Sequence, residues 1–126
     1  MAAKWIEALT GSIEQKKHYK LHMSRIEALP EPYRSAAKAL NRYFMYYGSV
    51  SDGELLITMI RDHADLWERA AIDGTPVRDV VGNDPVEFAE EFVRAYSDKE
   101  WLDKERSRLT KSIAAAAGES GQESKT

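Results

Sequence analysis

Cysteine is absent from this chain of 126 residues, so disulfide bonds and thiolate chemistry are both excluded. Long apolar runs are also missing, since none approaches the ~20 consecutive apolar residues that a membrane-spanning helix needs. The N-terminal stretch carries Glu7 where a secretion signal requires uninterrupted apolar residues. We therefore expect a cytoplasmic protein that does not enter a membrane.

Motifs that bring catalytic groups together are missing as well. The chain has no Gly-x-Ser-x-Gly turn, no phosphate loop ending in Gly-Lys and no Gly-x-Gly-x-x-Gly dinucleotide signature. Its many carboxylates are spread along polar helix faces, where nothing isolates a pair in an apolar setting. We predict no catalytic residue and no cofactor, and hence a protein that is not an enzyme.

What is present is helical periodicity. Apolar residues recur at spacings of three and four, and no stretch alternates apolar with polar residues as a strand does. This pattern predicts an all-α fold, a compact bundle of about five helices. The predicted helices cover residues 12–29, 32–47, 51–73, 75–82 and 84–96.

Residues that favour helix ends support these boundaries. Gly48 and Gly74 are placed to end two helices in the left-handed conformation. Ser51 with Glu54 has the pattern of a capping box, and Asp84 before a proline is a second start signal. Beyond residue 96 the sequence leaves two alternatives.

Either Ser97 and Glu100 cap a last helix with Leu102, Leu109 and Ile113 on its apolar face, or the chain bends there. The folded domain is predicted to span residues 12–117. Before it, residues 1–11 form a short amphipathic segment around Trp5. After it, residues 118–126 contain no apolar side chain, so we expect a disordered tail.

Charge is distributed unevenly although the net charge is only −3. Residues 1–49 hold eight basic against four acidic residues, and residues 50–100 hold five against thirteen. Solvated helix faces explain this pattern, and so does a dipolar surface that meets a protein partner or a second copy of the chain. Duplex nucleic acid normally requires a basic protein, so we expect no direct nucleic-acid binding.

Histidine is the first candidate for site chemistry. Glu14, His18 and His22 follow one another at four-residue steps and share one helix side, but zinc needs further ligands that the spacing does not supply. We interpret them as a solvated polar edge and predict no metal site. His63 falls inside the apolar face of its helix, which indicates a buried neutral imidazole bonded to a backbone carbonyl; a base in a pocket is the alternative.

Aromatic residues are more informative. Four of them crowd residues 43–47, more than one helix face can bury, and Trp5 lies on a segment that needs a covering surface. The predicted ligand or partner contacts are Trp5, Tyr46, Tyr47, His63 and Trp67. Core packing of most of these aromatics is the other interpretation.

Two stretches carry a family resemblance. Ala28-Leu29-Pro30 with Tyr33, and the run from Trp67 through Gly74 and Gly82 to Phe88, resemble the bacterial domain of unknown function 1048 over about residues 12–113. The resemblance implies a compact helical protein with a left-handed superhelical path. It also implies a gene beside that of a PadR-like transcriptional repressor, and it assigns no catalytic residue.

We therefore expect a helical interaction or accessory protein that acts without catalysis, either as a homodimer or with a PadR-like regulator as its partner. The alternative is a helical protein that binds a small molecule in an aromatic-lined pocket.

Overall fold

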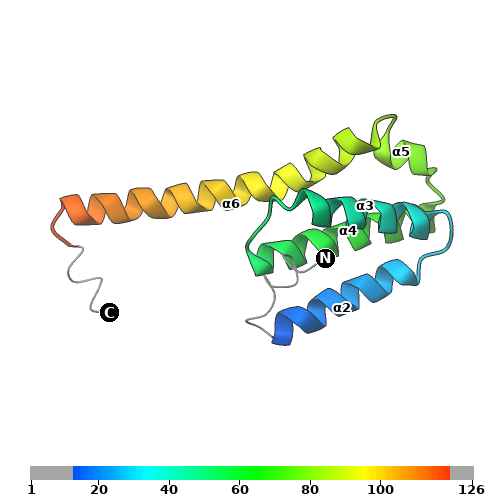
Figure 1. The fold of residues 1–126 in the computed structure, drawn as a ribbon, viewed down its shortest axis with the longest axis horizontal. Helices are drawn as coiled ribbons and strands as arrows, with labels where there is room; N and C mark the ends of the chain where they lie inside the picture. The colour runs from blue at the N-terminus through cyan, green and yellow to red at the C-terminus, as the bar shows by residue number, and fades with distance from the viewer. Residues whose placement is uncertain (1–12, 120–126) are drawn as a thin grey trace.

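The computed structural model describes residues 13–119; residues 1–12 and 120–126 are not described. Within 13–119 the chain forms helices and no strand, which confirms the predicted all-α class (Figure 1). The predicted segment at residues 1–11 and positions 120–126 of the predicted tail lie outside the described residues. The helices are α2 (Ile13–Glu27), α3 (Tyr33–Tyr47), α4 (Gly53–Asp73), α5 (Val77–Val81) and α6 (Pro85–Ala116).

Helix α4 is the centre of the fold, because α2, α3 and the first half of α6 all pack against it (Figure 1). The apolar periodicity of each helix supplies the contacts, and burying this surface contributes about 25 cal/mol per Å². The buried core side chains include Ile26 and Leu29 near the end of α2, Ala37, Leu40 and Phe44 on α3, Leu56, Met59, Ile60, Ala64, Trp67 and Ala70 on α4, and Ala89 and Val93 on α6.

Three predicted helix ends are confirmed. Gly48 and Gly74 follow α3 and α4 with φ angles of 63° and 69°, a conformation that a Cβ atom disfavours. The carboxylate of Asp84 accepts a hydrogen bond from the backbone N–H of Glu87 at 3.0 Å and so caps α6. Local sequence decides these ends because each cap needs only residues within one helical turn.

The predicted capping box at the start of α4 is wrong. Asp52 is the capping residue, and its carboxylate accepts from the N–H of Leu55 at 3.0 Å. Ser51 instead donates from its backbone N–H (3.1 Å) and its hydroxyl (2.5 Å) to the carboxylate of Glu100 on α6. Ser51 therefore bonds to Glu100, which is distant in the sequence, instead of capping α4.

Both predicted alternatives at Ser97, the start of a last helix and a bend in the chain, are wrong. Helix α6 continues through this position and contains 32 residues, about 48 Å at 1.5 Å per residue. The hydroxyl of Ser97 donates to the carbonyl of Arg94 within the helix (3.4 Å). Residues 101–116, which we call the arm, extend away from the other described helices (Figure 1).

Candidate interaction surface

His63 and Trp67, two of the predicted contact residues, are core residues with no exposed surface. The indole N–H of Trp67 donates to Nε2 of His63 at 2.9 Å, and Nδ1 of His63 lies 2.8 Å from Oδ1 of Asn41. Because an indole can only donate, Nε2 must accept, and the imidazole proton is on Nδ1 and donates to Asn41. These contacts leave no face of either ring for a ligand.

Burial lowers the pKa of His63 from its ordinary 6.5 to about 3, because the low-dielectric core disfavours the imidazolium. The predicted burial is therefore confirmed, and the lowered pKa favours the neutral form that was predicted with it. The predicted partner is wrong: a side-chain amide, not a backbone carbonyl, bonds to the ring. Asn41 stands 22 residues away in the chain, so no local pattern pointed to it.

Tyr46 and Tyr47 do lie on the surface, with 74% and 38% of their area exposed. The guanidinium carbon of Arg42 lies 5.2 Å from the ring centroid of Tyr46, and the rings of Tyr43 and Tyr47 stack at 5.8 Å. We call these four residues, Arg42, Tyr43, Tyr46 and Tyr47, the aromatic patch. Because each ring rests on a neighbour one turn away, the patch is ordered before any partner arrives.

Trp5, the fifth predicted contact, lies outside the described residues. The structure thus separates the other four: Tyr46 and Tyr47 are on the surface of α3, and His63 and Trp67 are in the core. They do not form one site.

The predicted solvated polar edge is wrong at His22, which is buried on the side of α2 that packs against α4. His22 belongs to a cluster that the sequence did not reveal. Arg25 donates to Nδ1 of His22 (3.0 Å), to Asp65, and to both oxygens of Glu68 (2.9 and 2.7 Å), and it thereby joins α2 to α4. The hydrogen bond from Arg25 holds the pKa of Glu68 below its ordinary value, and burial together with the Arg25 charge lowers that of His22.

His18, beside this cluster, stacks on His22 with ring centroids 6.4 Å apart. Nε2 of His18 lies 3.9 Å from the carboxylate of Glu14. Among residues 13–119, no three potential metal ligands come together.

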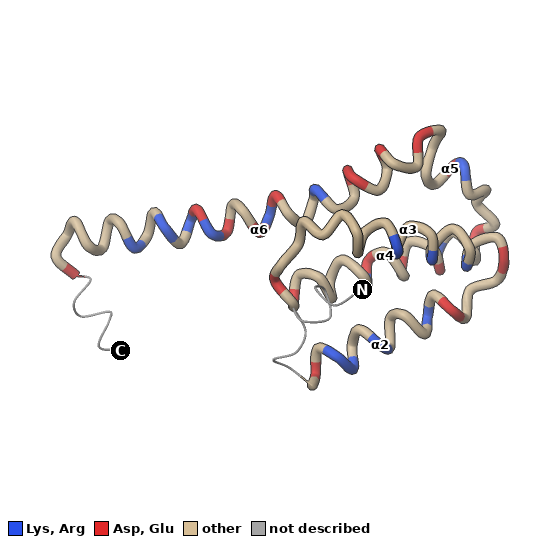
Figure 2. Tube along the Cα trace, viewed as in Figure 1, with Lys and Arg blue, Asp and Glu red and all other residues tan. Residues whose placement is uncertain are grey.

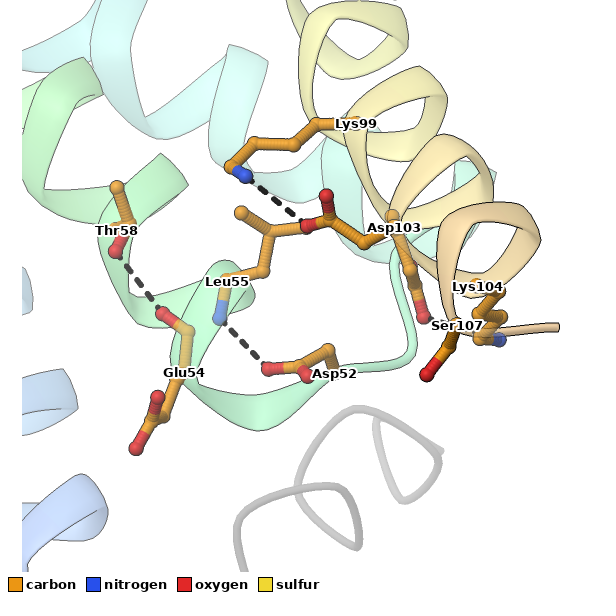
Figure 3. A pocket seen from close by; sticks show the side chains of 9 residues that line it. Asp52, Glu54, Leu55, Thr58, Lys99, Asp103, Lys104 and Ser107 are labelled. Atoms are coloured by element: carbon orange, nitrogen blue, oxygen red, sulfur yellow. Dashed lines mark hydrogen bonds and ion pairs between the residues drawn. The ribbon is translucent and has the colours of Figure 1, made fainter. Parts of the chain in front are cut away.

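A polar hollow of about 400 Å³ lies where the arm leaves the body, between the start of α4 and α6 (Figure 3). Burial alone would raise the pKa of Glu100, but the hydrogen bonds from Ser51 and the nearby charge of Lys104 outweigh it and the pKa is lowered. Four acidic and two basic residues line the hollow. The lining consists of Asp52, Glu54, Leu55, Thr58, Lys99, Glu100, Asp103, Lys104 and Ser107.

The arm itself exposes large apolar side chains. Trp101 is 63% exposed, Leu102 41%, Leu109 63% and Ile113 60%. Ala114 is the only buried apolar residue of the arm. The sequence marked three of these residues as the apolar face of a helix, but periodicity does not reveal whether another element covers that face.

An apolar groove of about 290 Å³ runs between α3, α5 and the start of α6. Tyr43 of the aromatic patch forms part of its wall and donates its hydroxyl proton to Glu90 at 2.6 Å. Tyr43 is also the only aromatic residue in the lining, so this groove is not the aromatic-lined pocket of the alternative interpretation. The lining consists of Ala36, Ala39, Leu40, Tyr43, Val77, Arg78, Val81, Pro85, Val86 and Ala89.

Fold and surface together define an all-α protein with an ordered aromatic patch, an apolar groove and an exposed helical arm. Residues 10–114 match the family described as "Protein of unknown function (DUF1048)", and the chain belongs to this family. No curated protein and no solved structure matches the chain. None of the described helices is long and apolar enough to cross a membrane.

Proposed function

We propose that the chain is a non-catalytic cytoplasmic interaction protein that binds a PadR-like transcriptional regulator. The observation that carries this proposal is the aromatic patch, which exposes tyrosine and arginine side chains already held in place. These residue types dominate the energetic centres of protein interfaces. Side chains that are ordered beforehand lose less conformational entropy when a partner binds. The choice of regulator comes from the family resemblance.

The proposal is tested with the purified chain and the PadR-like regulator encoded nearest to its gene. Isothermal titration is expected to show binding that Tyr46→Ala weakens about 30-fold, which corresponds to roughly 2 kcal/mol. Ile72→Ala is the matched control, because Ile72 is 78% exposed at the end of α4, away from the patch. Absence of binding, or equal weakening by both variants, would contradict the proposal.

The apolar groove supports a second candidate function, the binding of a small apolar molecule. Its volume lies near the lower end of known ligand pockets, and its lining is mostly aliphatic. Ala39→Phe would fill the groove from an exposed position, and Ala95→Phe makes the same change on α6 outside it. A small apolar ligand should raise the melting temperature of wild type and of Ala95→Phe, but not that of Ala39→Phe. A shift that survives Ala39→Phe rules out this groove.

A further inference from the structure

The arm carries three large apolar side chains on one side that no described helix covers. Leu102, Leu109 and Ile113 are separated by seven and four residues, so their side chains lie along the same side of α6. All three are more than 40% exposed. A helical segment of 16 residues gains little stability from hydrogen bonding alone, since isolated helices of this length are marginal in water. This face therefore favours a covering partner.

Charge along the same part of α6 is segregated (Figure 2). Residues 98–105, where the arm joins the body, include four acidic and two basic residues, whereas the distal part of the arm, residues 106–116, has three basic residues and no acidic one. Among residues 13–119, no acidic side chain forms an ion pair with Arg108 or Lys111. If two such helices paired in parallel, each basic segment would lie beside the other basic segment. Antiparallel pairing instead places the basic segment of each helix beside the acidic segment of the other.

We infer that two copies of this chain associate through their arms, which pair antiparallel with the Leu102, Leu109 and Ile113 faces in contact. The contact is isologous, because the arm of each copy supplies both the acidic segment and the basic segment that pair with the other copy. It goes beyond the proposed function, since the arm and the aromatic patch are separate surfaces. Association of this kind leaves the patch of each copy open to the regulator.

Analytical ultracentrifugation of the full chain tests the inference. Wild type is expected to be a dimer, and Leu109→Glu should raise its dissociation constant at least ~10-fold, which corresponds to about 1.4 kcal/mol. The matched control is Ile72→Glu, which places the same charge on an exposed apolar position of the body and should leave the dimer intact. Far-UV circular dichroism checks that both variants remain helical.

The orientation has its own test, because the chain has no cysteine and introduced thiols report only on the new contact. Mixing the Leu102→Cys and Ile113→Cys chains under mild oxidation should give mainly the mixed disulfide. Disulfides within each variant alone would mean parallel arms and overturn the orientation.

A wild-type monomer at every accessible concentration, or a dimer that Leu109→Glu does not weaken, would overturn the association through the arms. Regulator binding that persists in such a monomer leaves the proposed function standing. If Tyr46→Ala loses regulator binding while the dimer stays intact, the result supports both the proposed function and the association through the arms. The two hypotheses therefore fail separately.

Discussion

Lowering the pH from 8 to 5 should destabilise the protein by about 2 kcal/mol through His63. The folded pKa is about 3 and that of an unfolded histidine about 6.5, so below pH 6.5 the unfolded chain binds a proton that the core excludes. Each pH unit below 6.5 then favours unfolding by about 1.4 kcal/mol, and pH 5 lies about 1.5 units below. The stability is thus complete above pH 6.5 and falls as the pH drops towards 3.

The assay is urea unfolding at pH 8, 7, 6 and 5, with the free energy of unfolding compared between wild type and His63→Gln. The variant should be less stable at pH 8 by roughly 1–3 kcal/mol, because glutamine does not restore both hydrogen bonds, yet most of its pH dependence should be gone. His22 contributes in the same direction because its pKa is also lowered, so His22→Gln is measured in parallel.

His18→Gln serves as the control, since the side chain of His18 is 52% exposed. The range stops at pH 5 because Glu68 and Glu100 have lowered pKa values, and the stability they contribute disappears at more acidic pH. An NMR titration that places the pKa of His63 near 6.5 would refute the reasoning. So would a His63→Gln variant with the full wild-type dependence on pH.

Three further substitutions test the contacts that hold the helices together. Arg25→Met should cost roughly 1–2 kcal/mol, a value reduced because Glu68 is partly exposed, and an unchanged urea midpoint would mean that the cluster is not stabilising. Glu100→Gln should cost about 1 kcal/mol by weakening the hydrogen bonds from Ser51, with the full loss above the ordinary carboxyl pKa of 4.5 and a shrinking loss as the pH falls below it; a loss that does not shrink on acidification would argue against a role for the charge. Gly74→Ala should lower stability by about 1 kcal/mol because φ is 69°, although its Cβ meets no atom within 4 Å, and a stabilised variant in thermal melts would contradict this.

The sequence by itself determined the helices and most of their ends. Leu40, Phe44 and His63 stood on apolar faces that three- and four-residue spacing defines, and all three are buried. Gly48 and Asp84 mark helix ends through contacts within a single turn, so their signals do not depend on the rest of the fold. The same locality explains why the all-α class was predictable.

Tertiary structure alone decided which partners these residues meet. Arg25 reaches Glu68 across 43 positions of sequence, and Asn41 reaches His63 across 22, because helix packing brings their side chains together. It also decided that α6 runs on as an exposed arm. Periodicity identifies the apolar face that Leu109 shares, but only the positions of the other helices determine whether that face is covered by the protein's own core or stays open to a second chain.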